Sequence, residues 1–369
     1  MKYANWNVPE RGAEIPRPLL AAGCTPLLAA ILHLRGLSEP AAARSFLRGG
    51  AETLTNPLEL TGMVDAVQRL SRAVATGEHV AVYGDYDVDG ITAACLLTDY
   101  LRSRGLTCEL YIPDRIREGY GLNNAAIDVL AEKGVTLIVT VDCGVTNLEE
   151  TAYAAQRGVD MIVTDHHECR ETLPEAEAVV DPKQPDGNGI GTALAGVGVA
   201  FKLVCAMDGD AGKMLARYGD LVAVGTVADV MPLLGENRFI TRCGLQKIAA
   251  GDCRPGFLAL AEEAGVRDKP FTASTVGFSL APRINAAGRL GEPSLAVRLL
   301  EETDPRRARI LAAELCAKNR ERQALETEIW REAVERLHGE RPDAPIVLAA
   351  ENWHPGVIGI VASRLTDAY

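Results

Sequence analysis

The sequence lacks paired-cysteine motifs and long apolar runs. Its nine cysteines include no Cys-x-x-Cys pair, which excludes a thiolate zinc site of the usual spacing. An odd number of cysteines without regular spacing is typical of reduced thiols packed inside a cytoplasmic protein. No segment resembles a signal peptide, and none is long enough to cross a bilayer. We therefore expect a cytoplasmic chain that does not act at a membrane.

Nucleotide-binding motifs and an excess of basic charge are also missing. The pattern G-x-x-x-x-G-K-[ST] does not occur, and Gly196-Val197-Gly198 lacks the third glycine of a dinucleotide fingerprint. The formal net charge of −12 argues against broad coating of a nucleic acid, because binding to phosphates relies on a basic surface. Two interpretations remain compatible with this charge: a nucleic-acid enzyme with a localised binding channel, and a phosphatase that acts on a small substrate.

Four short clusters of acidic residues and histidines stand out in what the sequence does contain. They are GDYDVDG at 84–90, VDCG at 141–144, TDHH at 164–167 and VADVMP at 227–232. Each follows an apolar run, so the charged side chains are expected at the ends of buried elements, where isolated charge is costly. Repetition of acid at successive strand ends favours a metal site over ordinary surface turns.

Three of the apolar runs have the pattern of buried strands. Residues 79–84, 136–141 and 160–165 are short, rich in valine and isoleucine, and separated by helix-like segments. This pattern predicts an α/β fold with a parallel sheet and crossover helices. Open parallel sheets bind ligands at the carboxyl edge, so acids far apart in sequence can converge there. The run 221–230 is expected to be a helix that delivers Asp229 to the same crevice.

Ligand chemistry favours Mn2+ or Mg2+. Carboxylate oxygens with one or two imidazoles suit these ions, and more than four carboxylates together can hold two cations about 3.5–4 Å apart. Such a pair activates water and stabilises the leaving oxygen of a phosphoester. The run from Asp85 to Gly90 also matches the start of a calcium EF-hand loop, but the twelfth position, which needs a bidentate glutamate, is Leu96. The EF-hand is excluded.

A series of longer motifs resembles one known family. In chain order these are GDYDVDGIT, PDRIREGYGL, VDCG, TDHH, LAGVGVAFKL, GTVADVMPL, APRINAAGRL, NRERQ and WHPGVIGIVASRL. The series is similar to the RecJ family of single-strand-specific 5′ to 3′ DNA exonucleases, within the DHH phosphoesterase superfamily. The resemblance covers nearly the whole chain, including Trp6. It implies two-metal hydrolysis of phosphodiesters that releases 5′ mononucleotides, in DNA recombination and repair.

The resemblance implies a set of ligands for two Mn2+ or Mg2+ ions. The matching residues are Asp87, Asp89, Asp142, His166 and Asp229. Catalysis would depend on Asp87, Asp89, Asp142 and His167. Asp142 corresponds to the carboxylate that bridges the two ions. Asp85 is a further candidate ligand, although Asp85 and Asp165 could instead orient histidines or water. His167 is the candidate contact to the scissile phosphate oxygen, and the other interpretation is a hydrogen-bonded core histidine.

Further residues in these motifs are expected to hold the DNA. The candidate contacts to phosphates are Arg115, Arg283, Asn285 and Arg289. We expect them on glycine-rich or proline-bounded turns, where a planar guanidinium can bind phosphate with two hydrogen bonds. Tyr86 and Tyr120 could stack on a base, although core packing is commoner. His354 opens a helix whose N-terminal amides favour an anion, or it simply starts that helix.

Four segments are expected along the chain. Residues 1–65 form a helical lead, 66–300 the DHH catalytic α/β domain, 304–339 one long connecting helix, and 343–369 the start of an incomplete DHHA1-type α/β domain. Residues 344–350 are expected to be a strand of that domain. RecJ proteins continue with a Gly/Ser/Arg-containing segment that helps hold the 5′ phosphate and with an oligonucleotide-binding barrel, and this sequence contains neither.

Three other functions remain open. A DHH-type phosphodiesterase acting on short oligonucleotides or cyclic dinucleotides would use the same ions and prefer dinucleotides to long strands. A pyrophosphatase of this superfamily would have a histidine four residues before Asp87, where this sequence has Tyr83. An inactive replisome scaffold would have lost metal-binding acids, and all are present. The resemblance also suggests single-stranded DNA, a RecQ-like helicase and a single-strand-binding protein as partners.

Overall fold

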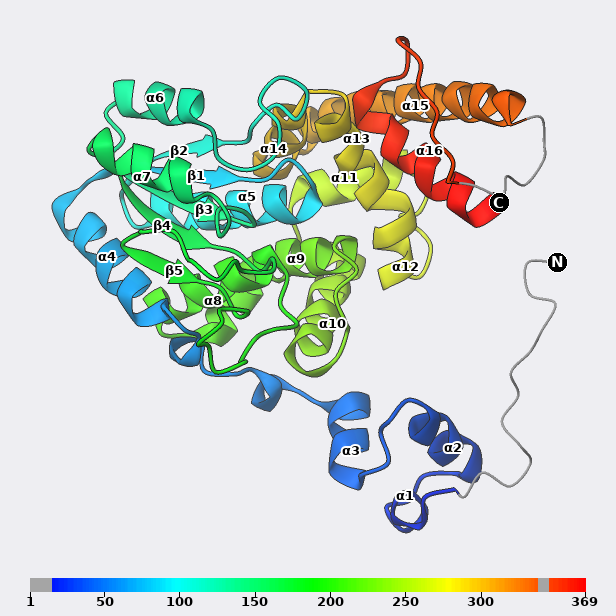
Figure 1. Ribbon diagram of the computed structural model, residues 1–369. Coiled ribbons are helices and arrows are strands. Elements are labelled where there is room, and N and C mark those ends of the chain that lie inside the picture. The colour runs from blue at the N-terminus through cyan, green and yellow to red at the C-terminus, as the bar shows by residue number, and fades with distance from the viewer. Residues whose placement is uncertain (1–14, 338–344) are drawn as a thin grey trace.

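A five-stranded parallel sheet forms the centre of the computed structural model (Figure 1), which describes residues 15–337 and 345–369. The strands are β1 (His79–Gly84), β2 (Thr107–Tyr111), β3 (Leu137–Val141), β4 (Asp160–Thr164) and β5 (Ala178–Val180). Their order is β2-β1-β3-β4-β5, and every neighbouring pair is parallel. The strand order reverses between β1 and β3, and folds of this class bind ligands at the carboxyl edge of that point.

Helices cover both faces of the sheet. One face carries α4 (Met63–Thr76), α5 (Val88–Ser103) and α8 (Gly196–Asp208), and the other carries α6 (Asn124–Glu132) and α7 (Leu148–Gln156). Side chains alternate along each strand, so Val80 and Val82 of β1 join the first core, while Ala81 and Tyr83 join the second. Burial on both faces explains why the predicted strands are almost continuously apolar.

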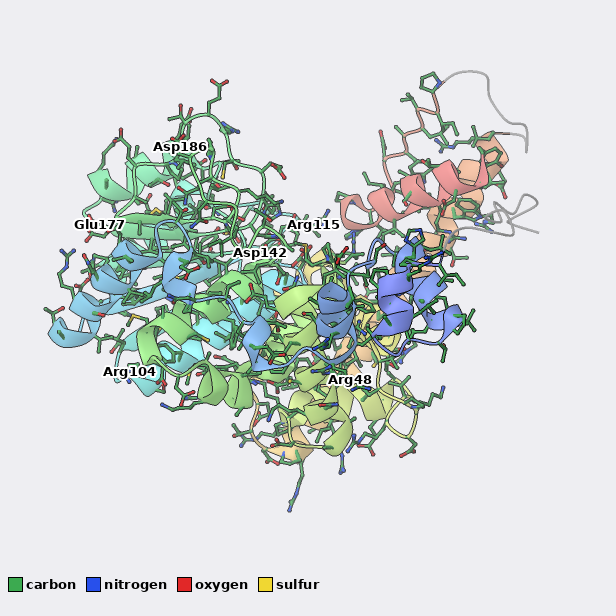
Figure 2. The ribbon with its side chains drawn as sticks, turned by 90° about the horizontal axis from the view of Figure 1, so that it is seen from below. Arg48, Arg104, Arg115, Asp142, Glu177 and Asp186 are labelled. Atoms are coloured by element: carbon green, nitrogen blue, oxygen red, sulfur yellow. The ribbon has the colours of Figure 1, made fainter. Side chains whose placement is uncertain are left out.

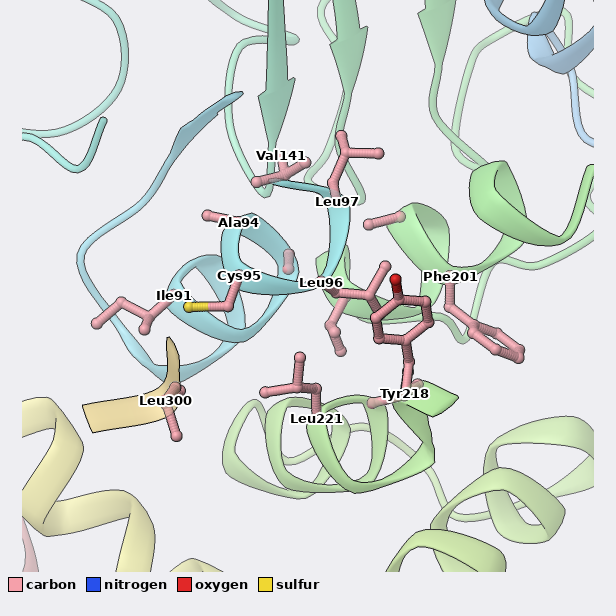
Figure 3. Close-up of a cluster of buried hydrophobic side chains, with 14 of the residues drawn as sticks. Ile91, Ala94, Cys95, Leu96, Leu97, Val141, Phe201, Tyr218, Leu221 and Leu300 are labelled. Carbon is pink, nitrogen blue, oxygen red and sulfur yellow. The ribbon is translucent and has the colours of Figure 1, made fainter. Parts of the chain in front are cut away.

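A helical layer extends the first core away from the sheet. It contains α9 (Ala211–Ala228), α10 (Gly235–Ala250), α11 (Pro255–Glu263), α12 (Ala273–Thr275), a π-helix (Val276–Leu280), α13 (Ala281–Arg289) and α14 (Pro293–Glu301). Figure 3 shows Leu96 of α5 beside Tyr218 and Leu221 of α9 in this core, and all three are buried. Packing of α9 against α5 sets the direction in which the end of α9 points.

The two ends of the described chain are helical. Near the N-terminus lie α1 (Arg17–Ala21), α2 (Pro26–Leu34) and α3 (Pro40–Arg48), apart from the sheet in Figure 1. At the other end, α15 (Pro305–Arg336) is followed by α16 (Pro355–Ala368). None of the described helices combines the length and the apolar character that crossing a bilayer requires.

The predicted α/β class with a parallel sheet is confirmed. The three predicted strands correspond to β1, β3 and β4, whereas β2 and β5 were not predicted. The prediction of a strand at 344–350 is wrong for residues 345–350, which the structure describes. These residues form no strand, and they are not part of the five-stranded sheet. Trp6 and residues 338–344 lie outside the described residues. The domain boundaries stay a prediction.

Candidate metal centre

The carboxyl ends of three strands bring the predicted acids and histidines together. Asp85 follows β1, Asp142 follows β3, the Asp-His-His motif follows β4, and Asp229 caps the end of α9. Three groups of ligand atoms result, and within each group the atoms lie within 4.8 Å of one another. The groups are Asp142, His166 and His167; Asp89, His166 and Asp229; and Asp85, Asp87 and Asp142. Because Asp142 and His166 each belong to two groups, the arrangement fits two neighbouring cations.

Several buried polar atoms of this cluster have no hydrogen-bond partner. They are Asp85 Oδ1, Asp142 Oδ1 and both ring nitrogens of His166. His166 Nε2 lies 3.0 Å from Asp142 Oδ1 and 3.8 Å from Asp89 Oδ2. Two ligand atoms about 2.1 Å from one octahedral ion lie ~3.0 Å apart. Unpartnered oxygens and an imidazole nitrogen at this spacing fit Mn2+ or Mg2+.

Four carboxyl groups of the cluster have raised pKa values when no cation is present. Burial, followed by repulsion from Asp87, raises the pKa of Asp85 to about 7 and that of Asp229 to about 6. Burial also raises the pKa of Asp89 and of Asp142, and nearby carboxylates add to both shifts. A divalent cation would reverse these shifts, because an opposite charge stabilises each ionised form.

The two adjacent histidines have opposite surroundings. Burial, followed by the charge of His167, lowers the pKa of His166 to about 4, so the His166 ring is neutral at neutral pH and can be a ligand. His167 is half exposed, and its Nδ1 lies 2.7 Å from Asp165 Oδ1. That hydrogen bond is the main cause of the raised pKa of His167. His167 is therefore not a core histidine, and its Nε2 is the ring nitrogen left for a substrate.

Asp165 orients its neighbours through several hydrogen bonds. Its carboxylate accepts from the backbone N–H groups of Val145 at 3.0 Å, His166 at 2.7 Å and His167 at 3.2 Å. Burial opposes ionisation, but the hydrogen bonds from His167 and from these amides keep the pKa of Asp165 below its ordinary value. An ionised Asp165 that is fully used in this way orients the histidine pair and is absent from the three ligand groups.

The start of α8 holds Asp89. The carboxylate accepts from the backbone N–H of Gly196 at 2.6 Å and of Val197 at 2.9 Å, so it faces the positive end of the helix. A side chain at residue 196 would not fit, because its Cβ would lie 2.5 Å from the Cβ of Asp142. The sequence did not predict this contact. Asp87 caps α5 and accepts from the N–H of Asp89 at 2.8 Å.

A cleft of about 240 Å³ opens beside the acidic cluster. Its lining residues are Asp85, Tyr86, Asp87, Arg115, Tyr120, Asn285 and Arg289. The Arg115 guanidinium lies over the Tyr86 ring, 4.9 Å from its centroid. Arg115 and Arg289 both line this cleft, and burial, followed by the charge of Arg115, lowers the pKa of Arg289. Figure 2 shows Arg115 and Asp142 towards the middle of the view. Two arginines in one cleft suit phosphate oxygens.

Glu118 fixes the loop that carries Arg115 into the cleft. Its carboxylate accepts from the hydroxyl of Tyr111 at 2.7 Å, the backbone N–H of Asp114 at 2.6 Å and the side chain of Asn123 at 3.3 Å. These partners belong to the end of β2, the loop itself and the start of α6. The loop is therefore tied at both ends, although the sequence indicated no such role for Glu118.

Tyr83 and Tyr120 differ in burial and in their hydrogen-bond partners. Tyr83 is buried in the second core, and its hydroxyl donates to the carbonyl of Gly121 at 2.9 Å, which leaves the pyrophosphatase interpretation without its histidine. Tyr120 is half exposed, and its hydroxyl lies 3.4 Å from His167 Nδ1. Tyr120 is therefore available to a ligand at the metal centre.

Arg283 does not reach the cleft. The segment 282–289, predicted to be a turn, belongs to helix α13. Proline is favoured in the first turn of a helix, and the alanines that follow have a high helix propensity. The Arg283 guanidinium donates to the carbonyl of Ser279 and lies 3.3 Å from the thiol of Cys316 on α15. It therefore joins α13 to α15, and Arg289 is the arginine of this helix that lines the cleft.

Asn285 links two helices, and His354 caps the start of a third. Asn285 Oδ1 accepts from the backbone N–H of Val88 at 3.1 Å, which ties α13 to the start of α5. His354 is the N-cap of α16, and its Nδ1 accepts from the N–H of Gly356 at 3.1 Å. Arg289 donates to the carbonyl of Gly356 at 3.2 Å. The start of α16 thus lies against the helix that lines the cleft.

Asp181 is a strand-end acid that sequence reasoning missed. It follows β5 and is 1% exposed; Oδ1 accepts from the N–H of Lys183 at 2.7 Å, and Oδ2 is buried without a partner. Burial raises its pKa to about 6. With only three residues, β5 is too short to be recognised from apolar periodicity.

Comparison with known proteins places this arrangement in a family. The DHH family, N-terminal domain, matches residues 79–226. The single-stranded-DNA-specific exonuclease RecJ of Bacillus subtilis is 41% identical over 346 residues, which are 94% of this chain and 44% of that protein. A crystal structure of exonuclease RecJ bound to manganese matches with a TM-score of 0.76 at 40% identity, covering 85% of this chain and 79% of that one. This chain belongs to the RecJ family.

The match to the RecJ family extends over nearly all of this chain but not over all of its relatives. A crystal structure of RecJ from Thermus thermophilus in complex with Mn2+ has a TM-score of 0.82 at 36% identity, and the match covers 96% of this chain and 51% of that one. The chain spans about half the length of the curated relatives it matches, such as 44% of RecJ from Bacillus subtilis.

Proposed function

We propose that this chain carries the activity of a single-stranded-DNA-specific exonuclease that hydrolyses phosphodiesters from the 5′ end and releases 5′ mononucleotides. The main observation behind this proposal is that carboxylates and imidazoles from three strand ends and the end of α9 lie close together. Asp142 and His166 each belong to two of the ligand groups. The curated RecJ relatives, which are named single-stranded-DNA-specific exonucleases, support the substrate. We place the reaction in DNA recombination and repair.

The cofactor we propose is a pair of Mn2+ or Mg2+ ions. Mn2+ is bound in the two RecJ crystal structures described above, and the donor set of this chain suits either ion. The residues that would hold the ions are Asp85, Asp87, Asp89, Asp142, His166 and Asp229. When bound, the ions supply Lewis-acid stabilisation of the phosphate and lower the pKa of water.

The other polar residues of the site would bind and orient the substrate. Arg115 and Arg289 supply fixed positive charge in the cleft, and their guanidinium groups match phosphate oxygens. His167 carries its proton at Nδ1 towards Asp165, and the raised pKa of His167 lets Nε2–H donate to a phosphate oxygen. Tyr120 lies next to His167 and offers an exposed ring to a base.

Replacing Asp142 tests this function. In D142A the candidate bridging carboxylate is lost, so we expect metal-dependent digestion of a 5′-phosphorylated single strand to fall by about 10²-fold or more. The measurement is shortening of a 3′-labelled strand with Mn2+ or Mg2+, beside a dinucleotide. D186A, which removes an exposed acid, is the control. Near-normal rates in D142A would refute the two-metal site, and cleavage of the dinucleotide alone would favour a short-oligonucleotide phosphodiesterase.

We also propose the cytoplasm as the location and a RecQ-like helicase and a single-strand-binding protein as partners. Both follow from membership of the RecJ family together with single-stranded DNA as the substrate. A helicase would supply the strand on which the exonuclease acts, and a single-strand-binding protein would keep that strand unpaired.

A further inference from the structure

Two non-glycine residues in the described ranges, 15–337 and 345–369, have positive φ angles: the candidate ligand Asp142, and Val230, which directly follows the candidate ligand Asp229. Asp142 has a φ of 62° and Val230 has a φ of 58°. Aspartate tolerates the left-handed region, whereas a β-branched valine there is strained. Backbone strain of this kind is retained mainly at functional sites. The ligand role proposed for Asp142 accounts for the first residue but not for Val230.

The turn at Val230 is one that this chain makes elsewhere with glycine. At the end of α9, the N–H of Val230 donates to the carbonyl of Val227 at 3.2 Å, and the N–H of Met231 donates to that of Thr226 at 3.3 Å. Three other helices end on left-handed glycines with φ angles of 70°, 81° and 79°. These are Gly77 after α4, Gly209 after α8 and Gly251 after α10. The helix end alone therefore does not require valine.

Packing inside the chain does not account for the valine either. Its side chain is 86% exposed, so it contributes little to the core. Asp229, the preceding residue, belongs to a ligand group, and its Oδ2 lies 3.7 Å from His166 Nε2. Consecutive Cα atoms are about 3.8 Å apart, so Val230 lies directly beside a candidate ligand of the metal centre. A strained and exposed apolar side chain remains, next to a candidate ligand.

We propose that Val230 contacts the substrate, and that its isopropyl group packs against the sugar and base of the nucleotide whose phosphate lies at the metal centre. This inference rests on the exonuclease function proposed above. The acids and arginines of the site recognise the phosphate, which leaves the less polar faces of the nucleotide to be covered. An apolar residue beside a candidate ligand can cover them without reading the base sequence, because every base and sugar has such a face.

Two substitutions separate the strain from the contact. V230G removes both, so its thermal unfolding midpoint should rise by about 1–3 °C while the KM for a single strand rises about three- to tenfold. V230A keeps Cβ and most of the strain, so its midpoint should change little while its KM rises similarly. The value of kcat should stay within about twofold in both, because the contact is made equally in the ground and transition states. V347G is the control, since Val347 is 88% exposed and lies outside the site.

The outcomes distinguish this inference from the function on which it rests. A KM within about twofold of wild type in V230G and V230A overturns the contact, whatever happens to the unfolding midpoint. An equal rise of KM in V347G also overturns it. If V230G fails to fold, V230A decides. If wild type does not digest the strand, the exonuclease proposal fails but the contact proposal can still be tested. The test is then the affinity of wild type and of V230A for the same oligonucleotide in Mn2+. Equal affinity of wild type and V230A then overturns it.

Discussion

At the scale of single residues, the behaviour of His167 depends on Asp165. The Asp165 carboxylate holds Nδ1 of His167 at 2.7 Å and also accepts from the backbone N–H groups of Val145 and His166. Its negative charge raises the pKa of His167, while burial lowers that of His166. The pKa values of two adjacent residues of the same type are thus shifted in opposite directions, and only the environment distinguishes a candidate ligand from a candidate proton donor.

Removing the charge of Asp165 should weaken catalysis and shift its pH dependence. In D165N the pKa of His167 falls, so the loss of activity on the alkaline side moves to lower pH, and kcat falls by about 10–100-fold. The measurement is a pH–rate profile of strand digestion with saturating Mn2+.

A double variant is the control for that prediction. If Asp165 acts through His167, D165N combined with H167A should be little worse than H167A alone. Additive losses, or an alkaline limb that does not move in D165N, would contradict this role.

At the scale of elements, the close approach of α8 to the end of β3 shapes the site. Gly196 begins α8, donates to Asp89 and leaves no room for a Cβ beside Asp142. The helix end stabilises the carboxylate through its amides and its dipole. A helix that began with a larger residue could not approach Asp142 this closely. Glycine is therefore required at this position because of the close contact, and not because of its backbone conformation.

Gly196→Ala should therefore damage both the fold and the site. The new Cβ would overlap Asp142, so we expect a loss of about 1–3 kcal/mol in the free energy of unfolding and weaker Mn2+ binding. Urea unfolding with and without Mn2+ measures both effects. G359A is the matched control: Gly359 lies within α16 and a Cβ there meets nothing within 4 Å, so alanine should be neutral or slightly stabilising. Equal effects of the two substitutions would contradict the close contact.

At the scale of the whole molecule, the acidic cluster couples stability to pH and to cations. The pKa values of Asp85 and Asp229 are raised to about 7 and about 6, so without cations the folded protein binds more protons than the unfolded chain in this range. The stability that these groups contribute is complete below their unfolded pKa values and is lost as the pH rises towards 7. Bound cations would replace those protons.

The stabilisation by Mn2+ should therefore grow with pH. Thermal unfolding with and without an excess of Mn2+ should show a larger rise of the midpoint at about pH 7.5 than at about pH 5.5, because fewer protons compete for the ligands. Chelation should abolish the difference, and D142A should reduce it. A rise of the same size at both pH values would show that Mn2+ binds elsewhere.

The sequence by itself determined the parallel α/β class and which acids and histidines follow β1, β3 and β4, because buried strands are uniformly apolar and their ends are marked by charge. It could not show β5, which is too short, or that 282–289 is helical and directs Arg283 to α15. Tertiary structure alone decided the approach of α8 to Asp89, the link of Glu118 to the cleft loop, and the strain at Val230. The first feature joins segments far apart in the chain, and the other two are a set of side-chain contacts and a backbone angle that the pattern of residue types does not encode.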